Sequence, residues 1–265
     1  MKFYSEIALP ESKTAAKVRQ FTFADYITAN KFIQNGVNAH IQDCYIELAA
    51  KYSNSLNLAG LDALVVLIFM RVLSVGGTLK LTSGNTVTEI DLYGLLQSLS
   101  TLNVTPQVIL ISDNISIIIK TPAKFIDINK EDFIHAIIID GISRTLLPDE
   151  RCQLYNSLPA NTNELVAQYI TVIEEELSKI QFSIAGTKIE CSYMGGSLFE
   201  LVKVLYTANI INCFKKVVNI SNSLEVDTSY IVDLPPAEVD MFSSFVEEQR
   251  SANQEPQSSI PIRPA

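Results

Sequence analysis

The stretch Gly60–Val75, GLDALVVLIFMRVLSV, decides the fold because it is apolar around almost its whole circumference. Its longest uninterrupted apolar run, Ala63–Met70, is closed by Asp62 on one side and by Arg71 on the other. A helix that spans a membrane needs about 20 consecutive apolar residues. A shorter helix that is apolar on all sides is typically buried inside a domain. We therefore expect a central buried helix at these residues.

Composition sets the broad class of the chain. The 265 residues are 48% hydrophobic and 18% charged, and the formal net charge is −9. This apolar content excludes a mostly disordered chain. The acidic balance argues against general affinity for nucleic acid or anionic membrane, because both require clustered Lys and Arg. The length fits one large domain or two small ones.

Short β-like runs and helical stripes alternate on both sides of the central helix. We expect β-hairpins at 2–9 with 17–23, at 78–82 with 86–91, at 108–112 with 115–120, and at 181–185 with 188–193. We expect helices at 25–34, 37–52, 60–75, 92–99, 131–144, 163–180, 198–206, 209–218 and 237–250, although the Ile run inside 131–144 also suits a strand. The predicted fold class is α+β, with short β-hairpins and several helices around the central hydrophobic helix.

The pattern changes from β-rich to helix-rich at Thr121-Pro122, which divides the chain into 1–121 and 122–222. This change marks either a domain boundary or two halves of one core. Residues 223–250 form a third segment, in which an extended stretch at 226–234 leads through Pro235-Pro236 to an amphipathic helix. Residues 251–265 are rich in Pro, Ser and Gln, and their composition predicts a disordered tail.

The amphipathic helix at 237–250 carries the candidate partner-binding residues. Val239, Phe242, Phe245 and Val246 lie on one side of it. A helix behind a proline hinge can dock onto a partner or back onto its own domain. The sequence leaves both readings open.

The residues that usually hold metals are scattered along the chain. The sequence has Cys44, Cys152, Cys191, Cys213, His40 and His135. A zinc site usually takes four ligands in two close pairs, and only His40 and Cys44 are spaced to share a helix face. We therefore expect four reduced thiols and no metal. The sequence has no P-loop and no G-x-G-x-x-G motif, so we also expect no cofactor.

No catalytic constellation is evident, and we expect no catalytic residues. His135 lies among Phe133, Ile134 and Ile137, which is typical of a core histidine. Asp140 lies nearby in the sequence, so a base and its orienting partner are the enzymatic alternative, but no nucleophile accompanies them. The acidic run Glu174–Glu176 is typical of a solvated helix face, because successive helical positions point about 100° apart.

Three stretches resemble the base plate hub proteins of T-even-type contractile-tailed bacteriophages. The first is IALPESKTAAKVRQFTFADY at Ile7–Tyr26, similar to a hairpin with an "R-x-F-T" strand. The second is LDALVVLIFMRVLSVGGTLKL at Leu61–Leu81, similar to a helix that ends in Arg before "SVG" and a strand. The third runs from ISDNISIIIKTP at Ile111–Pro122 to FIHAIIIDGI at Phe133–Ile142.

The resemblance implies a non-enzymatic structural or assembly protein of a phage tail base plate hub. Its implied partners are other tail and base plate proteins, or a second copy of this chain, with no nucleic acid and no membrane. The implied location is the host cytoplasm during assembly. The resemblance leaves open whether the protein then stays in the hub, in the virion tail, or leaves as an assembly factor. Many relatives carry C-x-x-C-G where this chain has Cys191-Ser192-Tyr193-Met194-Gly195, so a family metal is not expected here.

Two other functions remain open at this stage. The chain could be a tail-assembly chaperone that holds a client such as the tape-measure protein and is absent from finished particles. It could also be a small cytoplasmic enzyme that uses Asp140 and His135. The Met1–Leu9 segment carries charges inside its apolar stretch and does not predict a signal peptide.

Overall fold

Helix α3 (Gly60–Val75) forms at the expected residues and lies at the centre of the protein. Its side chains from Leu64 to Ile68 are 0% exposed, so neighbouring elements cover it on every side. Asp62 and Arg71, which bracket the apolar run, are buried as well and bond to other parts of the chain. The computed structural model describes residues 4–55, 58–83, 86–184 and 186–253.

Helices hold 55% of the described residues and strands hold 20% of them, which confirms the α+β class. The other helices are α1 (Phe23–Asn35), α2 (Asn38–Tyr52), α4 (Leu92–Ser100), the 3₁₀ helix η1 (Lys130–Phe133), α5 (Pro148–Ser157), α6 (Ala160–Ser178), α7 (Ser197–Leu205), α8 (Ile210–Leu224), α9 (Thr228–Asp233) and α10 (Pro236–Asn253). The strands are β1 (Ser5–Ala8), β2 (Ala15–Val18), β3 (Thr78–Ser83), β4 (Thr86–Asp91), β5 (Gln107–Ser112), β6 (Ile115–Ile119), β7 (Ile134–Ile139), β8 (Ile142–Thr145), β9 (Gln181–Ile184) and β10 (Thr187–Glu190).

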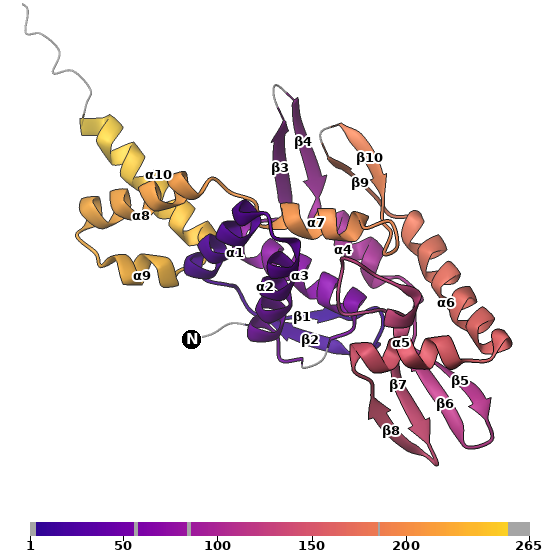
Figure 1. The fold of residues 1–265 in the computed structure, drawn as a ribbon. Coiled ribbons are helices and arrows are strands. Elements are labelled where there is room, and N and C mark those ends of the chain that lie inside the picture. Colours follow the sequence, from indigo (N-terminus) through magenta and orange to yellow (C-terminus); the bar gives the residue numbers. More distant parts are fainter. Residues whose placement is uncertain (1–3, 56–57, 84–85, 185, 254–265) are drawn as a thin grey trace, which may run out of the picture.

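All strand pairs are antiparallel neighbours in the sequence. Strands β5-β6-β7-β8 form one four-stranded sheet, whereas β1-β2, β3-β4 and β9-β10 are separate hairpins. Figure 1 shows the β3-β4 and β9-β10 hairpins rising from one side of the body and the four-stranded sheet extending from the opposite side. The protein therefore presents hairpins at both ends of a helical centre.

The helix expected at 131–144 is wrong. Residues 130–133 form η1, and the chain then continues as β7 and β8. The β-branched Ile run favours a strand, and Asp140-Gly141 supplies the two-residue turn that joins the strands. Both turn residues have positive φ, 50° at Asp140 and 80° at Gly141, as a tight hairpin of this kind requires.

The C-terminal part also differs from expectation. The extended segment expected at 226–234 is wrong, because residues 228–233 form α9 with the Asp227 carboxylate accepting from the Ser229 N–H at 2.7 Å. Residues 251–253, expected in the tail, continue α10, and the rest of the predicted tail, 254–265, lies outside the described residues. Helix α5 was not expected and begins at Pro148, a residue that suits a first helical turn.

One buried cluster runs through both sides of the change at Thr121-Pro122. It contains residues from Leu9 in the N-terminal loop to Val239 in α10. Helix α3 contacts α2, α4, α7 and α10, and Arg71 donates from Nε to the Leu205 carbonyl at 2.9 Å. Helix α8 packs against α9 and against α10, and all three pack against α1 on one side of the body (Figure 1).

Candidate functional site

The structure separates the two residues of the enzymatic alternative. His135 is near the start of β7, whereas Asp140 is in the exposed turn after that strand. A strand rises about 3.3 Å per residue, so the two side chains lie roughly 16 Å apart along it. They cannot act as a base and its orienting partner. Asp132, the other nearby acid, is instead paired with Lys124 at 2.7 Å.

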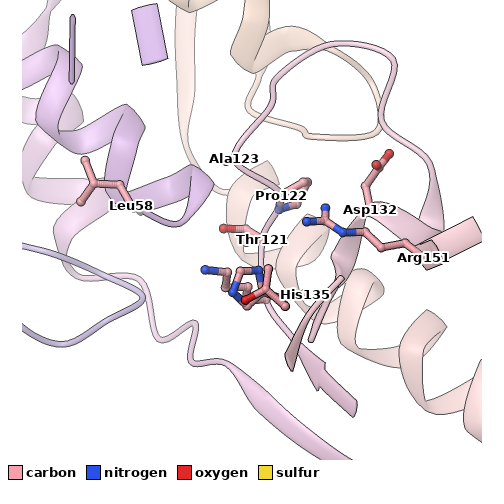
Figure 2. A pocket seen from close by; sticks show the side chains of 9 residues that line it. Leu58, Thr121, Pro122, Ala123, Asp132, His135 and Arg151 are labelled. Carbon is pink, nitrogen blue, oxygen red and sulfur yellow. The ribbon is translucent and has the colours of Figure 1, made fainter. Parts of the chain in front are cut away.

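His135 does line a pocket of about 230 Å³ between the four-stranded sheet and α5. Figure 2 shows its walls, which combine cationic, hydroxyl and apolar side chains. The lining residues are Leu58, Lys120, Thr121, Pro122, Ala123, Asp132, His135, Thr145 and Arg151. They come from the loop before α3, the segment after β6, the 3₁₀ helix η1, the strands β7 and β8, and helix α5, so no local sequence motif contains them.

Positive charge dominates this pocket. Burial, together with the positive charges of Lys120 and Arg151, lowers the pKa of His135 to about 4. Burial also lowers the pKa of Lys120, while the acidic groups Glu11 and Asp62 on its other side oppose that shift. His135 is therefore neutral at physiological pH, and the positive charge in the pocket is carried by Lys120 and Arg151.

The carboxylates near the pocket already have other partners. The Asp132 carboxylate binds Lys124 and accepts from the Asn129 N–H at 2.7 Å. In Figure 2 it points away from the Arg151 guanidinium, which is directed toward Thr121 and Pro122. Among the described residues, no carboxylate oxygen lies within 4.0 Å of the charged nitrogens of Lys120 or Arg151.

Two buried acidic residues, Glu11 and Asp62, lie behind Lys120. Their hydrogen bonds connect the N-terminal hairpin loop, the start of α3 and the segment after β6. The Asp62 carboxylate accepts from the N–H groups of Glu11 at 2.8 Å and Ser12 at 3.0 Å. The Glu11 carboxyl in turn accepts from the N–H of Thr121 at 2.8 Å and from its hydroxyl. Sequence analysis missed this pair, although a carboxylate at the start of a wholly apolar helix needs buried donors and signals such a network.

A second candidate site is an apolar stripe on the outer face of α8. Ile211, Phe214 and Val218 follow one another at i, i+3 and i+7 and are 65%, 46% and 52% exposed. The opposite side of α8 is buried through Cys213, Val217 and Ile220. We call the three exposed residues the α8 stripe. The sequence does not reveal them, because exposed and buried apolar positions of this helix show the same pattern.

The predicted partner-binding residues of α10 divide between core and surface. Val239 and Val246 are buried by the chain's own helices, and Phe242 packs against the core from its rim. Only Phe245 is largely exposed, at 47%. The helix thus docks onto its own domain through the face that also carries three of the four candidate residues.

The loop at Cys191 is held by hydrogen bonds. Glu174 accepts from the Ser192 hydroxyl at 2.6 Å and from the N–H groups of Tyr193 at 2.9 Å and Met194 at 3.1 Å. Glu174 was expected on a solvated helix face, and it instead fastens this loop to α6. Cys191 itself is buried, and burial raises the pKa of its thiol to about 12.

All four cysteines carry free thiols. Within the described residues, no three His, Cys, Asp or Glu side chains gather in a way that could hold a metal ion. Over the same residues, the helices are too short or too polar to cross a membrane. Comparison of the chain with protein-family models, with curated proteins and with solved structures gives no match.

Proposed function

We propose that this chain is a non-enzymatic structural or assembly protein of a phage tail base plate hub and acts through protein–protein contacts. The α8 stripe is the observation that carries the proposal. Large apolar side chains in a continuous row on one helix face mark an interaction surface when their own domain leaves them uncovered. An apolar helix face of this spacing fits a groove or a second helix on a partner protein.

The four-stranded sheet adds apolar surface at the opposite end of the molecule. Val108 and Leu110 on β5 are 63% and 65% exposed, and Ile142 at the tip of the sheet is 74% exposed. A protein that bridges neighbours in an assembly needs contact surfaces at separate ends. The order of motifs that resembles base plate hub proteins supports the same function.

The proposal is tested by capturing tagged full-length protein from infected cells and identifying the bound proteins by mass spectrometry. The informative variant replaces Ile211, Phe214 and Val218 by Ser. The matched control replaces Leu165 and Val172 by Ser, because these residues of α6 are 45% and 51% exposed but belong to another surface.

We expect the unaltered protein and the α6 control to recover tail or base plate proteins and the α8 variant to lose them. Recovery of no phage protein would contradict the proposal and favour an enzyme. The protein content of finished phage particles distinguishes a hub subunit from a chaperone. A hub subunit is present in them at fixed stoichiometry, whereas a chaperone for the tape-measure protein is absent.

A further inference from the structure

We propose that the pocket lined by Lys120, His135 and Arg151 binds a phosphate group, either as free phosphate or as part of a small phosphomonoester. This binding site goes beyond the assembly role and does not depend on it. Lys120 directly follows β6, His135 is on β7 and Arg151 is on α5, and all three line one cavity of about 230 Å³. Figure 2 shows His135 and Arg151 in its wall.

Two cations line the pocket, and within the described part of the chain no carboxylate oxygen lies within 4.0 Å of their charged nitrogens. Lys120 and Arg151 bring two positive charges to a partly buried pocket, in a protein whose net charge is −9. Arg151 uses its Nε to donate to the Leu146 carbonyl at 3.1 Å, which fixes the side chain and leaves the two terminal nitrogens for a ligand. Glu11 and Asp62 lie on the other side of Lys120, but their carboxyl groups already accept hydrogen bonds from Thr121, Glu11 and Ser12. On the pocket side the two partly buried cations face no carboxylate within 4.0 Å among the described residues, and a bound anion offsets the cost of burying them.

The two cations favour phosphate over other anions. A phosphate group carries a charge of about −1.5 to −2 at pH 7 and offers several acceptor oxygens. It therefore balances two cations, whereas a carboxylate balances one. The guanidinium of Arg151 matches phosphate oxygens with paired donors, and Lys120 adds a point charge. The Thr145 hydroxyl and the His135 ring add further polar groups to the lining.

The pocket also has an apolar wall. Leu58, Pro122 and Ala123 supply apolar surface beside the cationic groups. Sites for small molecules combine such apolar surface with a few placed polar groups. The cavity is smaller than the roughly 300–1,000 Å³ typical of drug-sized ligands, which limits the ligand to a phosphate or a small phosphomonoester.

The two histidines make the proposal directly measurable. His135 lines the pocket, whereas His40 is exposed on α2 and serves as an internal control. Inorganic phosphate is added to the full chain at about pH 6.5 and constant ionic strength, and the ring signals of both histidines are followed by NMR. A His40→Gln variant assigns the signals.

We expect a saturable shift of the His135 signal, half complete at roughly millimolar phosphate, and no shift of His40. Arg151→Gln and Lys120→Gln should each weaken binding about tenfold or more, whereas Lys130→Gln removes an exposed charge nearby and should leave binding unchanged. Arg151→Lys replaces Arg151→Gln should the latter fail to fold. Acetate should bind more weakly than phosphate.

A His135 signal that stays still or moves linearly up to tens of millimolar phosphate overturns the proposal. Equal binding by Arg151→Gln, or tighter binding of acetate, overturns it as well. Glycerol 3-phosphate distinguishes the two sources of the phosphate group: tighter binding than inorganic phosphate indicates a phosphomonoester, and equal binding indicates free phosphate. Because these readouts involve no partner protein, they succeed or fail independently of the assembly role.

Discussion

The carboxyl group of Glu11 accepts hydrogen bonds from both the backbone N–H and the side-chain hydroxyl of Thr121, which lies 110 residues further along the chain. Glu11 is 1% exposed and Thr121 is 0% exposed. Burial outweighs these hydrogen bonds and raises the pKa of Glu11 from 4.5 to about 7. The N-terminal hairpin loop is therefore anchored to the core through an acid that holds its proton in mildly acidic solution.

Stability should fall as the pH rises through the pKa of Glu11. The folded protein retains a proton that the unfolded chain releases above its ordinary pKa of 4.5, so this stabilisation is complete below that pH and is lost by about pH 7. The loss from this group is on the order of 3 kcal/mol. Chemical denaturation at about pH 5 and pH 8 measures it.

Glu11→Gln isolates this contribution, because Gln matches the protonated acid in size and cannot ionise. We expect the loss in the free energy of unfolding between about pH 5 and pH 8 to be on the order of 2 kcal/mol smaller in the variant than in the unaltered protein. The lowered pKa of His135 makes stability rise with pH in part of this range, which opposes the effect of Glu11. Both proteins contain His135, so its contribution cancels when they are compared. Glu6→Gln, on the exposed strand β1, is the control, and an equal pH dependence in all three proteins would contradict the prediction.

Glu174→Ala should destabilise the protein by about 2 kcal/mol, because it removes the acceptor of three hydrogen bonds and leaves backbone N–H groups unpaired. The neighbouring Glu175 is exposed and forms no hydrogen bond through its side chain within the described region, so Glu175→Ala is the matched control. Urea denaturation checks both. Equal stability of the two variants would show that the loop at 192–195 does not need its anchor.

Gly60→Ala should also destabilise the protein, by about 2 kcal/mol. A Cβ at Gly60 would overlap the Pro122 carbonyl oxygen and the Tyr193 hydroxyl, and the backbone at Pro122 has little room to move. Gly94→Ala is the control, because its Cβ would meet only the end of the Asp91 side chain. Thermal unfolding of both variants distinguishes this close approach from the general effect of replacing a helical glycine.

Val239→Ala should cost about 2 kcal/mol, because the side chain is buried where α10 docks onto its own domain. Met241→Ala, at an exposed position of the same helix, should change stability by less than about 0.5 kcal/mol. Urea denaturation compares the two. A negligible effect of Val239→Ala would mean that α10 can leave the domain without cost and is available to a partner.

Local patterns were sufficient to predict much of the fold. Helix α3 and strand β4 lie at the expected residues, because a continuous apolar run and a β-rich run before Leu92 carry their own signals. The 131–144 segment failed because consecutive Ile residues suit both a buried helix and a strand, and the deciding signal was the Asp140-Gly141 turn. The extended stretch predicted at 226–234 was wrong because Asp227 is an N-cap residue that begins helix α9.

The sites were much less predictable than the fold. Lys120, His135 and Arg151 come together only through the pairing of β6 with β7 and the placement of α5, a helix that was not expected. The spacing of these three residues in the sequence does not indicate that their side chains line one pocket. The α8 stripe was hidden for a different reason, since exposed and buried apolar positions on one helix look alike until the neighbouring helices are placed.

The bond between Glu11 and Thr121 also constrains when the protein can finish folding during synthesis. The 110 residues between them take about 5–20 s to translate at typical rates. Until Thr121 has left the ribosome, the hairpin loop at Glu11 lacks its anchor and its acid remains in water. The hairpin loop is therefore synthesised several seconds before the residue that anchors it.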